Sequence, residues 1–146
     1  MAVVLKKMDF DPWSEIKTFQ MDASHIHGQH GATATFVGTM RDFNEGNTVT
    51  KMTLEYYPGM TEKHLEKIIT EAKARWNFLE CLVIHRVGDI SPNDPIVLVA
   101  VWSSHRGGSF DACRFIMENL KSKAPFWKKE YTDKGDRWVE KNSSGY

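Results

Sequence analysis

The sequence predicts an α+β domain in which two main helices cover a mostly antiparallel sheet, with a C-terminal β hairpin. Three observations favour this fold class. Apolar and polar side chains alternate along residues 48–57, which is the pattern of a half-buried strand. Apolar residues recur at helical spacing in residues 61–76 and again in residues 109–120. Clusters of Gly, Pro, Asn and Asp separate these segments, and strands joined by short turns pair antiparallel.

The first part of the chain supplies two predicted strands. β-Forming residues dominate residues 31–40, and a polar loop separates them from the alternating strand at residues 48–57. We expect these two strands to pair with each other as a hairpin. Residues 1–30 show little pattern, except that Asp11 followed by Pro12 is typical of the start of a short helix.

The first main helix is predicted to begin at Thr61 as its N-cap, with Glu62 in the first turn, where the helix dipole favours an acidic residue. Its buried stripe consists of Leu65, Ile68, Ile69, Ala72 and Trp76. Two strands are expected next, over residues 81–87 and 96–102, with a dense turn sequence between them. The second of these is apolar without alternation, which predicts a central strand that is covered on both faces.

The second main helix is predicted to begin at Ser109 as its N-cap and to end before Pro125, because proline disfavours helical geometry in the residue that precedes it. Its buried stripe consists of Cys113, Ile116, Met117 and Leu120. A turn sequence at residues 133–136 predicts the terminal hairpin.

Composition limits the possible functions. The 146 residues indicate one domain, residues 1–146. Nineteen basic residues balance nineteen acidic ones, which argues against nucleic acid as a partner, because nonspecific binding to a polyanion needs excess positive charge. The longest apolar run, residues 96–102, is too short to span a bilayer, so no membrane partner is expected. The N-terminus lacks the features of a secretory signal, and a cytoplasmic location is predicted.

The cysteines and histidines do not predict a redox or metal site. Cys81 and Cys113 form no CxxC pair, and we expect both to be small buried side chains. His25, His27 and His30 have no cysteine or carboxylate partner at a defined spacing, so a polar loop is favoured over a zinc site. The sequence also lacks the phosphate-binding and dinucleotide-binding glycine motifs, and we predict no cofactor.

The segment SSHRGGSFD predicts a binding site for a small anion. A buried strand ends there, a glycine-rich loop follows, and a helix begins, which leaves free backbone N–H groups at the positive end of the helix dipole. Arg106 offers a planar set of donors that suits phosphate, and His105 can donate a hydrogen bond or move a proton. The alternative is a simple turn with a surface arginine.

Four lysines surround an apolar core in the segment KSKAPFWKKE. Lys121 falls beside the buried helix stripe, and we expect Phe126 and Trp127 to be anchored and to hold Lys128 in place. Burial lowers the pKa of a lysine and a nearby phosphate raises it, so such a residue can be tuned for proton transfer. The alternative is a solvated basic face at the end of a helix. Arg41 is either a third cationic contact or a loop residue.

Five segments in register strengthen the functional interpretation. They are GATATFVGTMRDFNEG, LEYYPGMTEKHL, VIHRVGDISPND, SSHRGGSFDACRFIMENLKSKAPFWKKE and GDRWVE, which together span residues 31–140. They closely resemble the large, MoaE-type catalytic subunit of molybdopterin synthase. The resemblance implies an α/β-hammerhead fold and a sulfurtransferase that acts in molybdenum cofactor biosynthesis. The implied reaction transfers sulfur to cyclic pyranopterin monophosphate (precursor Z), which becomes the molybdopterin dithiolene.

The resemblance also implies partners and site residues. A small ubiquitin-like, MoaD-type subunit would donate sulfur from its C-terminal thiocarboxylate, and two large subunits would form a central homodimer within a heterotetramer. Lys121 and Lys128 match the two key active-site lysines of the family, although which is acid and which is base stays open. The implied substrate-binding residues are Thr39, Met40, Arg41, His105, Arg106, Lys121, Lys128, Lys129 and Glu130.

Some features depart from the family or leave alternatives. Only one basic residue, Lys141, follows the RWVE motif, where the family offers more, so a cationic contact across the dimer is in doubt. One alternative function is a non-enzymatic scaffold that binds a ubiquitin-like partner. Another is a platform for single-stranded nucleic acid, which the balanced charge disfavours. Because sulfur would come from the partner, neither Cys81 nor Cys113 should be needed for the reaction.

Overall fold

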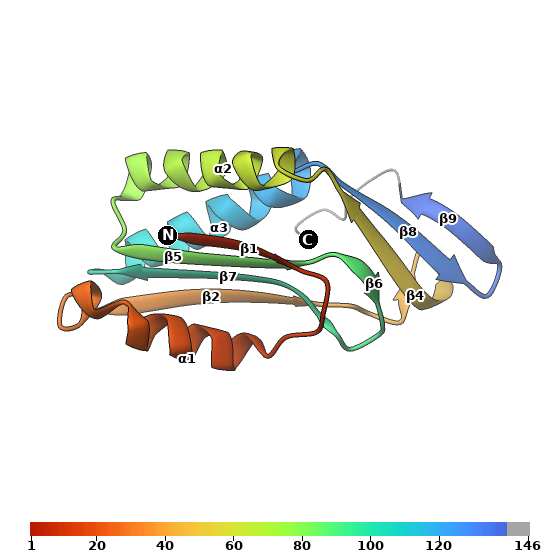
Figure 1. Ribbon diagram of the computed structural model, residues 1–146, viewed down its shortest axis with the longest axis horizontal. Coiled ribbons are helices and arrows are strands. Elements are labelled where there is room, and N and C mark those ends of the chain that lie inside the picture. Colours follow the sequence, from red (N-terminus) through yellow and green to blue (C-terminus); the bar gives the residue numbers. More distant parts are fainter. Residues whose placement is uncertain (140–146) are drawn as a thin grey trace.

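The computed structural model describes residues 1–139, which form two β-sheets and three α-helices (Figure 1). The first sheet has the strand order β1-β5-β7-β2 and the second the order β3-β4-β8-β9, with β6 paired to β4. The strands are β1 (Ala2–Lys6), β2 (Ala32–Thr39), β3 (Phe43–Asn44), β4 (Asn47–Tyr56), β5 (Glu80–Arg86), β6 (Gly88–Ile90), β7 (Pro95–Ser103), β8 (Phe126–Thr132) and β9 (Gly135–Val139). The mixed, antiparallel-rich architecture confirms the predicted α+β class.

Helices cover both faces of the first sheet. In Figure 1, α2 (Met60–Trp76) and α3 (Arg106–Lys123) lie on one face, and α1 (Pro12–Asp22) lies on the other. Alternate residues of β7 accordingly enter two separate cores, with Val99 on the α2–α3 side and Leu98 on the α1 side. The strand is central and covered on both faces, as its unbroken apolar sequence predicts.

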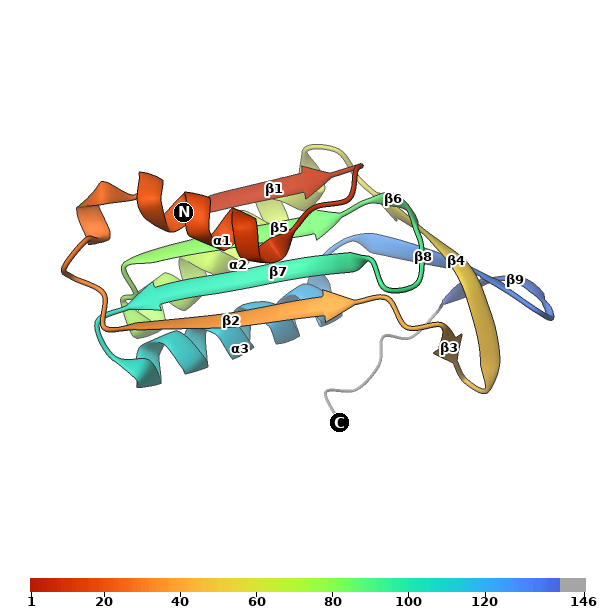
Figure 2. The ribbon, with the colours of Figure 1, turned by 90° about the horizontal axis from the view of Figure 1, so that it is seen from below.

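The second sheet extends from one end of the first (Figure 2). It has its own apolar core, in which Met52 and Leu54 of β4 pack with Ile90 of β6. Leu5 of β1 packs against this core as well as against the core beneath α2 and α3, so it joins the two sheets at their junction. The C-terminal hairpin is confirmed by the antiparallel pairing of β8 with β9.

The predicted hairpin between residues 31–40 and 48–57 is wrong. β2 pairs with β7 in the first sheet, whereas β4 pairs with β8 in the second. The apolar strand β7 needs a neighbour along each edge, and β2 supplies one of them. The chain then leaves the first sheet at a register irregularity between Gly38 and Thr39.

Both predicted N-caps of the main helices are misplaced. Helix α3 begins at Arg106, three residues before Ser109, whose hydroxyl donates to the Arg106 carbonyl in the first turn. Helix α2 follows Gly59, whose positive φ of 83° suits glycine and whose N–H donates to Glu62. Thr61 is buried instead, and its hydroxyl donates to a backbone carbonyl beside the start of β8.

The N-terminal region is more ordered than its sequence predicts. β1 pairs in parallel with β5, a strand that the weak pattern of residues 1–30 does not indicate. The predicted start of the short helix α1 is confirmed, since the Asp11 carboxylate accepts hydrogen bonds from the backbone N–H groups of Trp13 and Ser14. Within residues 1–139, no helix is both long and apolar enough to cross a membrane.

Candidate active site

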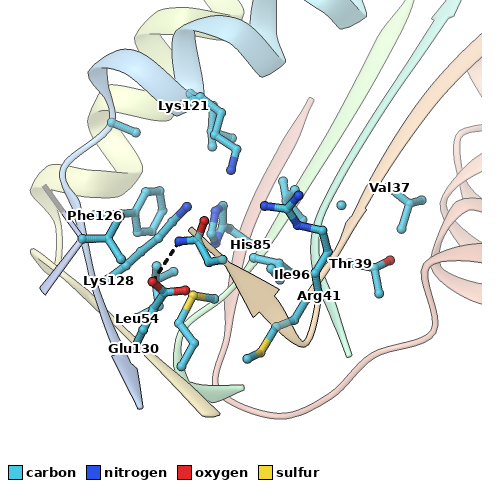
Figure 3. Close-up of a pocket in the computed structure, with 18 of the residues that line it drawn as sticks. Val37, Thr39, Arg41, Leu54, His85, Ile96, Lys121, Phe126, Lys128 and Glu130 are labelled. Carbon is cyan, nitrogen blue, oxygen red and sulfur yellow. Dashed lines mark hydrogen bonds between the residues drawn. The ribbon is translucent and has the colours of Figure 1, made fainter. Parts of the chain in front are cut away.

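A pocket of about 790 Å³ lies where the two sheets meet the end of α3 (Figure 3). Elements far apart in the sequence line it. Arg41 follows β2, His85 is the second-last residue of β5, Lys121 lies in the last turn of α3, and Lys128 and Glu130 extend from β8. Six of the predicted site residues line this pocket, namely Thr39, Met40, Arg41, Lys121, Lys128 and Glu130.

Strand β8 determines which side chains enter the pocket. Side chains alternate along a strand, so Phe126, Lys128 and Glu130 share the face that lines the pocket. The Phe126 ring stacks on His85 with centroids 4.1 Å apart, which anchors the strand as expected of this residue. Trp127 is 48% exposed, so the prediction that it too is anchored is wrong.

The two lysines interact directly. The pKa of Lys128 is lowered to about 8, mainly by burial and also by the charge of Lys121 and a side-chain hydrogen bond between the two lysines. The charge of Glu130 acts in the opposite direction. An amine with a pKa near 8 is roughly one-tenth neutral at pH 7, so it can serve either as a proton donor or as an acceptor.

His85 also lines the pocket, although it is not among the predicted site residues. Its Nδ1 lies 2.8 Å from the carbonyl oxygen of Arg86, which can only accept, so Nδ1 carries the proton. Burial lowers the pKa of His85 to about 4, and the nearby charges of Lys121 and Lys128 contribute. The imidazole is therefore neutral at physiological pH. The signal in the sequence that could have found it is a histidine directly after the apolar run CLVI.

Glu130 is the buried carboxylate of the pocket. Its Oε1 accepts hydrogen bonds from Asn44 Nδ2 at 2.9 Å, drawn as a dashed line in Figure 3, and from Arg137 Nε at 3.3 Å. Sequence reasoning did not single out Asn44 or Arg137. Asn44 belongs to a polar turn, and the GDRWVE motif that contains Arg137 was used only to support the resemblance.

The segment after β2 supplies one charge to the pocket. Arg41 is exposed, its guanidinium lies 4.9 Å from the centroid of the Phe43 ring, and its charge contributes to lowering the pKa of Lys128. Met40 is buried, and its backbone forms hydrogen bonds with Asn93 and Asp94. Met40 therefore fixes the backbone that carries Arg41.

Three predicted site residues lie outside the pocket of this chain. His105 and Arg106 are exposed at the start of α3. Lys121 lies fifteen residues after Arg106 along the helix, and at the rise of an α-helix this separates them by about 22 Å. Lys129 points to the opposite face of β8, where its ammonium lies over the rings of Tyr131 and Trp138. Lys141, the remaining basic residue of the C-terminal segment, lies outside the described residues.

The histidine-rich segment and the cysteines show no sign of metal or thiol chemistry. His25 contacts Glu80, and His27 contacts the carbonyl of Gln20. No cluster of three potential metal ligands occurs in residues 1–139. Cys81 and Cys113 are buried, and burial raises the pKa of both thiols, to about 11 for Cys113, so they are protonated and unreactive at neutral pH.

A two-sheet α+β protein whose junction gathers two hydrogen-bonded lysines, a buried carboxylate and an arginine is a candidate group-transfer enzyme. Comparison with known proteins gives its family. The family model described as MoaE protein matches residues 8–123, and the chain belongs to the MoaE family.

Individual relatives agree. A molybdopterin synthase catalytic subunit from Ralstonia nicotianae is 53% identical over 95% of this chain and 77% of its own length. A solved MoaE protein from Burkholderia ambifaria is 45% identical, with a TM-score of 0.80, over 98% of this chain and 91% of that one. A Helicobacter pylori complex of subunits 1 and 2 of molybdopterin-converting factor, 19% identical over 97% of this chain and 92% of that one, shares the fold with a TM-score of 0.78.

These matches confirm the resemblance and the fold class that the sequence indicates. They also confirm a sulfur-transferring enzyme with a role in molybdenum cofactor biosynthesis.

Proposed function

We propose that the junction pocket transfers sulfur from the C-terminal thiocarboxylate of a small ubiquitin-like subunit to cyclic pyranopterin monophosphate, forming the dithiolene of molybdopterin. The observation that carries this proposal is the hydrogen bond between Lys121 and Lys128, which brings together two amines from different elements. Proton transfer requires such reach, and the addition of sulfur with loss of oxygen requires protons to move.

The charges of the pocket suit both reactants. Lys121, Lys128 and Arg41 present positive charge to an anionic thiocarboxylate and to a substrate phosphate. Lys128, with its lowered pKa, contacts the thiocarboxylate and the reacting side chain of the pterin, while Lys121 exchanges a proton with it. The buried thiols take no part, because the transferred sulfur arrives on the partner.

The small subunit is the expected partner. The Helicobacter pylori protein that shares this fold was solved as a complex of two subunits, which supports a partner of this kind for the present chain. A homodimer is also part of the proposal. His105 and Arg106 are too far from Lys121 within one chain, so they can serve the same substrate only from a second copy. A cytoplasmic location stays a prediction.

The direct test mixes the protein with a thiocarboxylated small subunit and precursor Z and measures the dithiolene product. We expect one round of transfer per thiocarboxylate supplied. Lys121→Ala and Lys128→Ala should bind the small subunit with unchanged affinity but form no product. A scaffold without enzymatic activity would instead bind the partner and give no product even as the unmodified chain.

A further inference from the structure

One wall of the pocket contains a closed hydrogen-bond network centred on Arg137 of β9. Its Nε donates to Glu130, its Nη2 donates to the backbone carbonyl of Asn44 at 2.9 Å, and its Nη1 lies 3.4 Å from a carboxylate oxygen of Glu45. The Asn44 side chain donates to the same Glu130 oxygen, Oε1. The network therefore joins the turn between β3 and β4 to the β8–β9 hairpin.

The hydrogen bonds to Glu130 converge on one of its two carboxylate oxygens. Asn44 Nδ2 and Arg137 Nε both donate to Oε1. Glu130 is only 6% exposed, and it lines the pocket together with Lys128. Its carboxylate is therefore held at the pocket wall by donors from two separate elements.

Lys128 is affected by this carboxylate. It lies two residues before Glu130 on the same face of β8, and the negative charge of Glu130 opposes the effect of burial on the pKa of Lys128. A glutamate side chain has three rotatable bonds, so its charge acts at a constant distance only if its head is held. Asn44 and Arg137 hold it from two sides.

We propose that Asn44 and Arg137 are positioning residues of the active site, which hold the Glu130 carboxylate at a fixed distance from Lys128. The inference deepens the proposed function, because it rests on Lys128 as a catalytic residue. In this proposal neither residue contacts the reacting atoms, and each acts through Glu130. The network also anchors the far end of the segment that carries Arg41, since only two residues separate Arg41 from Asn44.

The most informative substitution is Asn44→Ala. Asn44 is half-buried at the end of β3, and its backbone contact to Arg137 survives the loss of the side chain, so we expect the fold to persist. Asn47→Ala is the matched control, because Asn47 is the partner of Asn44 in the β3–β4 pairing and its side chain makes no hydrogen bond within the described part of the chain. We expect Asn44→Ala to slow single-turnover sulfur transfer about tenfold, the usual effect of losing one hydrogen bond to a charged group.

A double-mutant cycle tests whether Asn44 acts through Glu130. In a Glu130→Gln background, Asn44→Ala should have little further effect on the rate, because the group that it positions has already been altered. If the two substitutions reduced the transfer rate independently, so that their effects multiplied in the double variant, the proposal would be overturned. Equal rates in Asn44→Ala and Asn47→Ala would overturn it as well.

A titration without substrate separates this inference from the proposed reaction. The pKa of Lys128 can be followed by NMR of protein labelled with ε-¹³C lysine, with Lys128→Arg used to assign the signal. Asn44→Ala changes no charge but releases the Glu130 head, so the negative charge of Glu130 should act on Lys128 from a greater distance and the pKa of Lys128 should fall, by about half a unit. Asn47→Ala leaves the hold on Glu130 intact and should leave the pKa of Lys128 unchanged.

Each result bears on a separate statement. If the unmodified protein forms no product yet Asn44→Ala lowers the pKa of Lys128, the proposed reaction fails and the positioning of Glu130 stands. An unchanged pKa in Asn44→Ala, in a protein with normal melting behaviour, would refute the positioning role even if sulfur transfer proceeds.

Discussion

The two ends of α3 carry cationic sequences that look alike but lie in different environments. At the start of the helix, His105 and Arg106 are exposed beside a glycine pair. At its end, Lys121 enters a pocket with Lys128 and the neutral ring of His85. The difference shows that a basic motif acquires distinctive chemistry when other elements bury it, since the pKa of Lys128 is lowered mainly by burial.

The largest effect should come from Lys128→Met, which keeps the length of the side chain and removes the amine. We expect single-turnover sulfur transfer to fall by about a thousandfold, within the range for loss of a general acid or base. Lys123→Met is the control, because Lys123 lies in the same last turn of α3 as Lys121 but is exposed. If both substitutions reduced the rate equally, the catalytic role of Lys128 could not be attributed to its burial in the pocket.

Much of the helix α3 and of strand β8 could be predicted, because their patterns are local. The apolar stripe, the stop at Pro125 and the lysines on either side of it are all visible in one segment. The pairing of β2 with β7 could not be predicted, since no residue in either strand identifies its neighbour. β1 was missed because five residues without alternation carry too little pattern.

The same limit applies to the site. Asn44 and Arg137 gain their roles from contacts with residues 86 and 93 positions away, which no motif spacing expresses. His85 was visible as a polar residue in an apolar run, but its stacking on Phe126 depends on how the two sheets meet. The resemblance to the family indicated which lysines matter, and the structure adds why: they share one pocket.

The second largest effect is the pH dependence of the free energy of unfolding, in which His85 should differ from His105. The pKa of His85 is lowered from 6.5 to about 4, so between these values the unfolded chain binds more protons than the folded one. The free energy of unfolding should therefore fall as pH falls through this window, by about 3 kcal/mol in total. Urea unfolding at several pH values measures it. His85→Gln should lose this dependence, whereas His105→Gln, at the exposed end of α3, should retain it.

A smaller effect is expected from Arg106→Ala at the exposed end. If Arg106 contacts the substrate from a second copy of the chain, its loss should weaken precursor Z binding about tenfold and leave the pKa of Lys128 unchanged. Mixing Arg106→Ala with Lys128→Ala should then restore up to about one-quarter of the normal rate, because half of the dimers are mixed and each has one complete site. If verified mixed dimers showed no recovery of the rate, Arg106 and Lys128 would not share a site, and the two ends of α3 would have separate functions.

The smallest effect on transfer should come from Cys113, which lies between the two ends of α3, combined with Cys81 on β5. Both thiols are buried with raised pKa values, and neither lines the pocket. They therefore belong to the apolar core and to neither cationic end of α3. Cys81→Ala with Cys113→Ala should lower the melting temperature by several degrees, as expected when buried atoms are removed from a core. Single-turnover transfer in the folded protein should stay within about twofold of normal, because the sulfur comes from the partner. A complete loss of transfer in a folded double variant would instead assign the sulfur chemistry to this chain.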